Sequence, residues 1–250
     1  MSGANNATKI ISSTGNSLID GVLTNRAWAE TTIDYSFPTH TSAYDYSGTG
    51  YESFVSNGSL LSNQQKNAIH FALNDGVGPN ASDGFSVEGF TAVNIFTVGN
   101  ANNLGDEIRF LNTSADLDPY SSQNPPARVT DFPGNYGSAS IADNGDVWFR
   151  STYNNGVFLT PEAGNYAWAT HLHEIGHALG LKHGHQSSIY GPLPVQFDSM
   201  EYSIMTYRSY VGKDTTTGYS NGTWDYAQTY MMADIAALQH MYGADFTINS

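Results

Sequence analysis

Two histidines and a glutamate lie close together in residues 173–183, which read HEIGHALGLKH. His173 and His177 are four residues apart, which places their imidazoles on one face of a helix, where both can bind one metal ion. Glu174 is rotated by about 100° around the helix axis from its neighbour. It therefore suits a water beside the metal better than the metal itself. The spacing predicts a metal-activated water with a carboxylate next to it.

A third ligand is predicted just after this helix. Gly180 can adopt the left-handed conformation that ends a helix, so that the chain turns back and His183 supplies a third nitrogen. His171 points to a nearly opposite helix face and should not bind the metal, whereas His185 could replace His183 only if the turn were rearranged. Three histidines with an open coordination position are typical of a catalytic zinc site rather than a structural one.

A methionine follows in the segment SIMTY, residues 203–207. The extended histidine motif followed by a methionine-containing turn matches the metzincin signature. The thioether of Met205 is soft and adaptable, and we expect it to pack beneath the ligand imidazoles rather than to bind the metal.

At this point the chain resembles the serralysin-type zinc metalloproteases, peptidase family M10. Besides the two motifs, the resemblance rests on WAETTIDYSFP (28–38), GDVWF (145–149) and ADIAALQHMYG (233–243), and it covers most of residues 19–245. The resemblance implies that Tyr207 reaches the zinc. Without the resemblance, we would interpret Tyr207 as a half-buried aromatic residue. Gly184 departs from the family, in which a proline is common after the third histidine.

Composition limits the partners. The net charge is −14 with only nine Lys and Arg, which argues against nucleic acid or an anionic membrane as a partner. We expect a protein or peptide substrate and a monomer, and a proteinaceous inhibitor stays open. Cysteine is absent, which excludes disulfides and thiolate zinc ligands.

The location of the protein rests on the resemblance alone. The N-terminus lacks a signal-peptide core and no run of eighteen apolar residues occurs. Serralysins are exported by a signal behind C-terminal calcium repeats, and the chain contains no GGxGxDx repeat. We therefore expect a secreted, extracellular protein of which this is the catalytic domain without the calcium-repeat domain.

The predicted fold is an α/β (α+β) metzincin-like zincin fold. It has a twisted, five-stranded, mostly parallel sheet with an antiparallel edge strand, two long helices and a small C-terminal subdomain ending in a helix. The residue pattern predicts strands over 31–37, 90–98, 107–111, 127–132 and 147–150, and prolines at both ends of the segment 127–132 suit an edge strand. Helices are predicted from the Ser62/Gln65 capping box, over 167–181 and over 230–242.

The expected organisation is a flexible leader or propeptide remnant (1–18) before a catalytic domain (19–250). Its subdomains, 19–183 and 184–250, would enclose the substrate cleft. By resemblance, the strand over 127–132 flanks that cleft and pairs with an extended substrate. Loop 186–202 should wall a hydrophobic pocket with its apolar residues, which are Ile189, Tyr190, Leu193, Val195 and Phe197.

A second metal is less well supported. Asp143-Asn144-Gly145-Asp146 has the clustered oxygens that suit calcium, but Asn-Gly already explains a tight turn. We prefer the turn, and calcium binding stays open. His70, on the first long helix, is expected to be a solvated or packing residue.

The resulting hypothesis is a secreted zinc metalloendopeptidase that cleaves internal bonds of extended polypeptides, with Glu174 as general base. One alternative is a non-catalytic, zinc-stabilised surface or adhesin module, which the acidic, Asn- and Gly-rich composition favours and the intact Glu174 opposes. The other is a hydrolase of peptidoglycan cross-links, against which the edge strand favours ordinary polypeptide.

Overall fold

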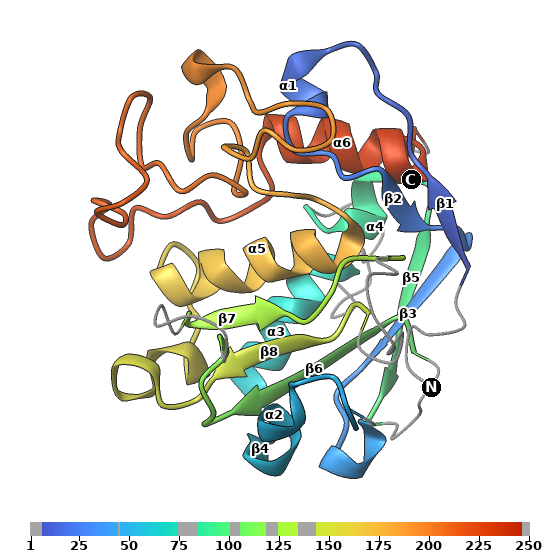
Figure 1. Cartoon of the computed structure of the whole chain (residues 1–250), viewed down its shortest axis with the longest axis vertical. Helices are drawn as coiled ribbons and strands as arrows, with labels where there is room; N and C mark the ends of the chain where they lie inside the picture. Colours follow the sequence, from blue (N-terminus) through green and yellow to red (C-terminus); the bar gives the residue numbers. More distant parts are fainter. Residues whose placement is uncertain are drawn as a thin grey trace.

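The computed structural model describes residues 7–44, 46–74, 85–100, 106–118, 125–134 and 144–246 (Figure 1). Its centre is a sheet with the strand order β5-β3-β6-β8-β7. The strands along this path are β5 (Asn94–Gly99), β3 (Thr32–Ser36), β6 (Ile108–Thr113), β8 (Val147–Arg150) and β7 (Ala127–Val129).

The sheet is mostly parallel, as predicted. Pairs β3–β5, β3–β6 and β6–β8 are parallel, and β7 is antiparallel to β8 at the predicted edge. Every residue of β6 is buried, as expected for a central strand covered on both faces. The strand count was wrong by one, because β4 (Gly58–Ser59) also pairs with β6. A two-residue strand is too short to show an alternating pattern.

Two long helices, α3 (Asn63–Leu73) and α5 (Tyr166–Leu179), pack against each other. The predicted capping box opens α3: the Ser62 hydroxyl accepts from the amide of Gln65, whose side chain accepts from the amide of Ser62. The last helix is α6 (Met232–Tyr242). Shorter elements are β1 (Thr8–Ile10), α1 (Ser17–Asp20), β2 (Arg26–Trp28), α2 (Glu52–Ser56), α4 (Val87–Phe90) and the 3₁₀ helices Thr41–Ala43, Tyr153–Leu159 and Val195–Phe197.

Two local predictions differ from the structure. The strand expected over 90–98 begins only at Asn94, because Ser86 caps a short helix by accepting from the amide of Gly89. The leader expected to be flexible is ordered where it is described, since β1 pairs with β2. The Asp20 carboxylate also accepts hydrogen bonds from the Ser13 to Gly15 segment. Residues 1–6 lie outside the described residues.

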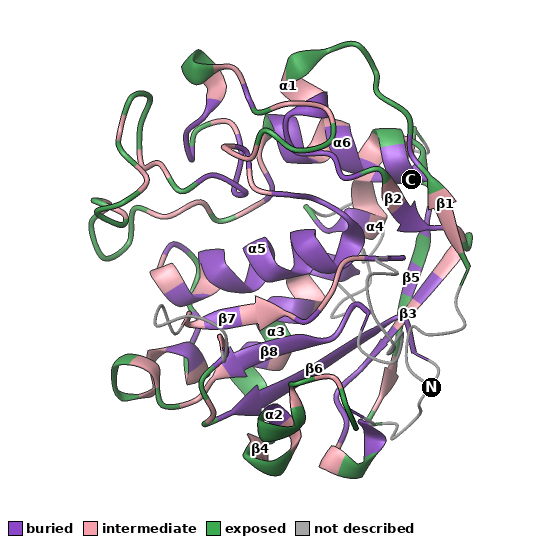
Figure 2. Cartoon of the chain, viewed as in Figure 1, coloured by how far each residue is buried: buried purple, intermediate pink, exposed green. Residues whose placement is uncertain are grey.

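Helix α5 is buried around almost its whole circumference (Figure 2). A helix that is apolar and buried on all sides lies between two layers rather than on a surface. In Figure 1 the sheet lies on one side of α5, and α6 with the loops of residues 181–231 lies on the other. The histidine motif is therefore held between the layers.

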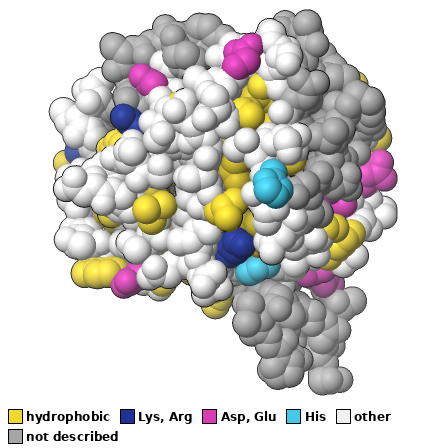
Figure 3. All heavy atoms as spheres, turned by 90° about the horizontal axis from the view of Figure 1, so that it is seen from below, with side chains coloured by type: hydrophobic (Ala, Val, Ile, Leu, Met, Phe, Trp, Pro, Cys, Tyr) yellow, Lys and Arg dark blue, Asp and Glu magenta, His cyan; other side chains and the backbone are white. Residues whose placement is uncertain are grey.

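The described surface is poor in basic side chains. Few Lys or Arg residues appear on the face in Figure 3, in keeping with nine in the whole chain. Among the described residues, no helix is both long and apolar enough to cross a membrane.

A buried carboxylate between β3 and β6 makes stability depend on pH. Glu107 Oε2 accepts from the amide of Asp34 at 2.8 Å, and Asp34 Oδ1 accepts from the amide of Glu107 at 3.1 Å. Burial raises the pKa of Glu107 from 4.5 to about 8. The folded state therefore favours the protonated acid. The contribution of Glu107 to the stability of the folded state is fully present below about pH 4 and is lost as pH rises towards 8.

The side chain of Glu107→Gln cannot ionise. At pH 8 the free energy of unfolding of this variant should therefore exceed that of wild type by about 2 kcal/mol, whereas at pH 4 the two should differ little. Urea unfolding at the two pH values measures this, with the exposed Glu30→Gln as control. An equal pH dependence in wild type and Glu107→Gln would contradict the prediction.

Candidate metal centre

The centre begins at the end of α5. Asn165 caps the helix by accepting from the amide of Trp168, and Gly180 ends it with a φ of 109°. A Cβ at Gly180 would lie 2.5 Å from the carbonyl oxygen of Arg26. Both the left-handed conformation and the close backbone contact therefore require glycine, and the turn after it is the predicted one.

The structure brings the three predicted histidines together. His183 Nε2 lies 3.0 Å from His177 Nε2 and 3.2 Å from His173 Nε2. A tetrahedral zinc ion with ordinary Zn–N bonds separates its ligand nitrogens by about 3.3 Å. Within the described residues, these histidines form a group that could hold a metal ion. The donor set and its spacing fit zinc.

The other ring nitrogens of two ligands face backbone carbonyls. His173 Nδ1 lies 2.8 Å from the oxygen of Ile204, and His177 Nδ1 lies 2.7 Å from that of Leu181. A carbonyl can only accept, so each Nδ1 carries the proton and each Nε2 lone pair is free for a metal. Burial lowers the pKa of His173 to about 4 and that of His177 to about 3, which keeps both rings neutral at neutral pH.

Glu174 and Tyr207 lie at the same place. Glu174 is 7% exposed and lines one cavity together with His173 and Tyr207. Burial raises the pKa of Glu174 to about 8, and the amide of Val129 and the charge of Arg128 oppose this rise. The Tyr207 hydroxyl lies 2.9 Å from His183 Nε2. A carboxyl group and a hydroxyl therefore line the same cavity as His173.

Met205 is fully buried, and its sulfur lies close to Gly176 of α5. A Cβ at Gly176 would come within 2.7 Å of this sulfur, so a larger residue there would force the Met205 side chain to shift. The amide of Gly184 donates to the carbonyl of Met205 at 3.0 Å. A proline at 184 could not donate this hydrogen bond.

Asp234, at the start of α6, holds the methionine turn. Its carboxylate accepts from the Ser203 hydroxyl at 2.6 Å and from the amide of Ile204 at 2.8 Å. The carbonyl of the same Ile204 faces His173 Nδ1. The last helix therefore supports a ligand ring through the turn.

The segment after the helix is anchored to the N-terminal part of the chain. The hydroxyl and amide of Thr24 both donate to the carbonyl of Gly180. The buried ammonium of Lys182 donates to the carbonyls of Gly21, Gln186 and Gly191 at 2.5, 3.0 and 2.9 Å. Burial lowers the pKa of Lys182 to about 8. Lys182 thus ties the loop that carries His183 to residues far away in the sequence.

Lys182→Met should leave these three carbonyls without their donor and lower the free energy of unfolding by about 3 kcal/mol. The loop around His183 should also loosen, so zinc should bind more weakly. Urea unfolding and zinc titration measure both effects, with Lys66→Met as the control for loss of a lysine. Unchanged unfolding of Lys182→Met would show that the carbonyls find other donors.

The spare histidines lie elsewhere. His171 faces the sheet, with its ring stacked on Phe149 at 3.9 Å and its Nδ1 2.7 Å from the oxygen of Ala167. His185 stacks on the outer side of His183, with ring centroids 5.3 Å apart, and it is not part of the metal-holding group. His70 contacts the Tyr35 hydroxyl through Nδ1, in line with a packing role.

The cavity beside the histidines has a volume of about 680 Å³. The prediction that the apolar residues of loop 186–202 form its wall was wrong, since from that loop only Met200 lines it. Leu193 instead packs closely against Gly21, and the Tyr190 hydroxyl donates to the carbonyl of Ile11. The walls come from residues 125–127, 153–174, 200–207 and 215–226. Sequence analysis missed Tyr219 and Tyr226, whose only signal was the local abundance of tyrosine.

The candidate calcium loop has other contacts. Asp146 forms a buried ion pair with Arg109 at 2.6 Å and accepts from the Tyr46 hydroxyl. Gly145 has a φ of 81°, as a tight turn requires. Asp143 lies outside the described residues, so calcium binding stays untested.

Comparisons with known proteins agree with this geometry. The family model described as metallo-peptidase family M12B, reprolysin-like, matches residues 132–245. Serralysin C of Dickeya chrysanthemi is 38% identical over 122 residues, which is 46% of this chain and 23% of that protein. The metalloprotease AprA of Pseudomonas entomophila is 34% identical over 129 residues, 48% of this chain and 24% of that protein. Residues 132–245 are therefore similar to the metallopeptidase region of these serralysin-type proteins.

A third relative, the serralysin of Proteus mirabilis, is 37% identical over 110 residues, 42% of this chain and 21% of that protein. These matches span about a quarter of the length of the relatives. They support the resemblance to serralysin-type metalloproteases. The roles of single residues rest on the geometry described above.

Proposed function

We propose that this chain is a secreted zinc metalloendopeptidase that hydrolyses internal bonds of extended polypeptides. The observation that carries the proposal is the grouping of three histidine Nε2 atoms, with the Tyr207 hydroxyl beside one of them and Glu174 lining the same cavity as His173. His173, His177 and His183 would hold the zinc ion, because their free nitrogens already lie at the spacing of zinc ligands. Secretion is proposed from the family resemblance.

Hydrolysis adds water across the peptide bond, so its carbonyl carbon gains a hydroxyl and its nitrogen gains a proton. A bound zinc ion would supply a Lewis acid that acidifies water and polarises the peptide carbonyl. Glu174 accepts the proton that the attacking water loses and passes it to the leaving amine. Its burial favours the protonated form, which helps it to take up the proton of the attacking water.

Tyr207 stabilises the charge that develops on the carbonyl oxygen. Its hydroxyl reaches a ligand nitrogen, and burial raises its pKa, so it remains a hydrogen-bond donor at neutral pH. A donor placed before the reaction stabilises an oxyanion without reorganisation at the moment of reaction.

The edge of the sheet offers a binding site for the substrate backbone. β7 pairs with β8 on one side and is the last strand of the sheet on the other. Residues at its start, Pro126 and Ala127, line the cavity with Glu174. An extended peptide added to this edge would gain main-chain hydrogen bonds irrespective of its side chains, which favours polypeptide over cell-wall cross-links.

Zinc removal tests the function. The zinc-loaded protein should hydrolyse casein, lose at least about 100-fold in rate after treatment with a chelator, and regain activity on addition of zinc. Isolated cell-wall material assayed beside casein separates a peptidase from a peptidoglycan hydrolase. Stable zinc binding without hydrolysis of either substrate would favour the non-catalytic module.

A further inference from the structure

One wall of the cavity beside the histidines consists of three tyrosines. Tyr166, Tyr219 and Tyr226 all line the cavity. Their ring centroids are 5.4 to 5.9 Å apart, so each ring contacts the other two. We refer to these three residues as the tyrosine wall. Aromatic rings at such distances prefer offset or edge-to-face arrangements and can extend them to a further ring.

The three residues of the tyrosine wall come from separate segments of the chain, and each segment is held by its own contacts. Tyr166 opens α5, close to the metal ligands. The Tyr219 hydroxyl donates to the carbonyl of Thr206 at 2.7 Å, beside Met205. The amide of Tyr226 donates to the carbonyl of Gly164 at 3.0 Å. Each ring therefore has a position that does not depend on a ligand.

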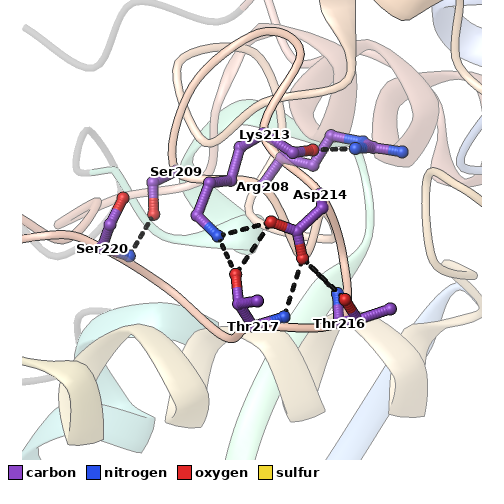
Figure 4. A network of polar contacts seen from close by, with 7 residues as sticks. All are labelled: Arg208, Ser209, Lys213, Asp214, Thr216, Thr217 and Ser220. Carbon is purple, nitrogen blue, oxygen red and sulfur yellow. Dashed lines mark hydrogen bonds and ion pairs between the residues drawn. The ribbon is translucent and has the colours of Figure 1, made fainter.

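Polar contacts within the loop that carries Tyr219 stabilise its conformation (Figure 4). The Asp214 carboxylate accepts from the amides and hydroxyls of Thr216 and Thr217, and Lys213 Nζ contacts the same carboxylate. The amide of Ser220 donates to the Ser209 hydroxyl across the loop. Arg208 anchors the start of this loop, because its Nε lies 2.7 Å from the carboxylate of Asp198. A wall held in this way loses little freedom when a side chain binds to it.

The chemistry of the cavity selects against acidic and small side chains. No Lys or Arg is among the residues that line it. An acidic side chain would therefore find no basic side chain to pair with, and a small one would leave the ring faces without contacts. The volume, about 680 Å³, is within the usual range for pockets that bind small molecules and accommodates a large side chain.

We propose that the tyrosine wall makes the enzyme select polypeptides with a large aromatic residue, Phe, Tyr or Trp, directly next to the bond that is cut. This inference rests on the proposed peptidase function. We place this residue next to the cut bond because His173 and Glu174 line the same cavity as the wall.

The test uses two peptide series of fixed sequence, varied to Phe, Leu, Ala or Asp on one or the other side of a single bond. For the zinc-loaded protein, kcat/KM should be about tenfold or more higher for Phe than for Ala on one side of the bond, with Asp lowest. Mass spectrometry of the products identifies that side. Equal kcat/KM for Phe and Ala on both sides would overturn the proposal.

Variants of Tyr226 connect the preference to the wall. Tyr226→Leu keeps an apolar side chain but lacks a ring, and it should lower the Phe-to-Ala ratio at least about fivefold with unchanged zinc content. Tyr226→Phe, which keeps the ring, should keep the preference. A Tyr226→Leu protein that binds zinc and retains the full wild-type ratio would refute the role of the wall.

A binding measurement separates the two proposals. Zinc-loaded Glu174→Gln, titrated calorimetrically with the intact Phe and Ala peptides, should bind the Phe peptide about tenfold more tightly. This difference should shrink when Tyr226→Leu is added. Such selective binding, together with a zinc-loaded wild-type protein that cleaves neither peptide nor casein, would refute the peptidase while supporting the pocket. Cleavage of casein without any aromatic preference would refute the pocket and leave the peptidase standing.

Discussion

Glu174→Gln is expected to retain zinc and to hydrolyse peptides about 10³-fold more slowly than wild type. Glutamine has nearly the same shape but cannot accept the proton of the attacking water. The carboxylate does not belong to the metal-holding group, so the three histidines should still bind the ion. Casein hydrolysis and zinc content, measured on the same preparation, test both parts of this expectation.

The control is Glu162→Gln, which changes an exposed glutamate shortly before α5. It should hydrolyse casein as wild type does, because its side chain lies outside the cavity. A Glu174→Gln protein that cleaves at the wild-type rate would remove this residue from the mechanism. Loss of zinc from Glu174→Gln would instead assign it a structural role at the centre.

His183→Ala is expected to weaken zinc binding by more than about 100-fold, whereas His185→Ala should change it little. Loss of partners beyond the ligands already costs about 10- to 100-fold in metal affinity, so loss of a ligand should cost more. His183 Nε2 lies within 3.2 Å of both other ligand nitrogens. His185 only stacks on the ring of His183. Zinc titration monitored by competition with a chromogenic chelator gives both affinities.

The opposite result is informative. Full zinc affinity in His183→Ala, together with its loss in His185→Ala, would mean that the turn after Gly180 rearranges when metal binds. Equal losses in both variants would indicate that the stacked pair is needed to hold the third ligand in place.

The metal site could be predicted from sequence because its rules are local. The four-residue spacing of His173 and His177 places both on one face of any helix, and Gly180 is the residue that ends such a helix. The capping box at Ser62 and Gln65 is local in the same sense, since the two residues satisfy each other's amides. Such features depend on residues close in sequence and little on the rest of the chain.

The cavity walls and the N-terminal segment could not be predicted, because long-range contacts determine them. Tyr219 and Tyr226 lie in a stretch without periodicity, and their rings meet Tyr166 only in the folded chain. Tyr190 and Leu193 of loop 186–202 were expected to line a pocket but pack against residues 11–21. The strand was expected to begin at Phe90, the last residue of the short helix α4, because a four-residue helix shows no 3.6-residue period.

The hydrogen bonds behind the third ligand join residues far apart in the sequence, 156 positions for Thr24 and Gly180 and 161 for Gly21 and Lys182. Asp234 adds support for the methionine turn from the last helix. A ribosome-bound chain that has just emerged through His183 therefore has every ligand but only part of the scaffold that orients them. Assembly of the centre should be delayed until α6 has been synthesised and has docked. In the proposed peptidase, such a delay would keep the nascent chain from cleaving its neighbours in the cell that makes it.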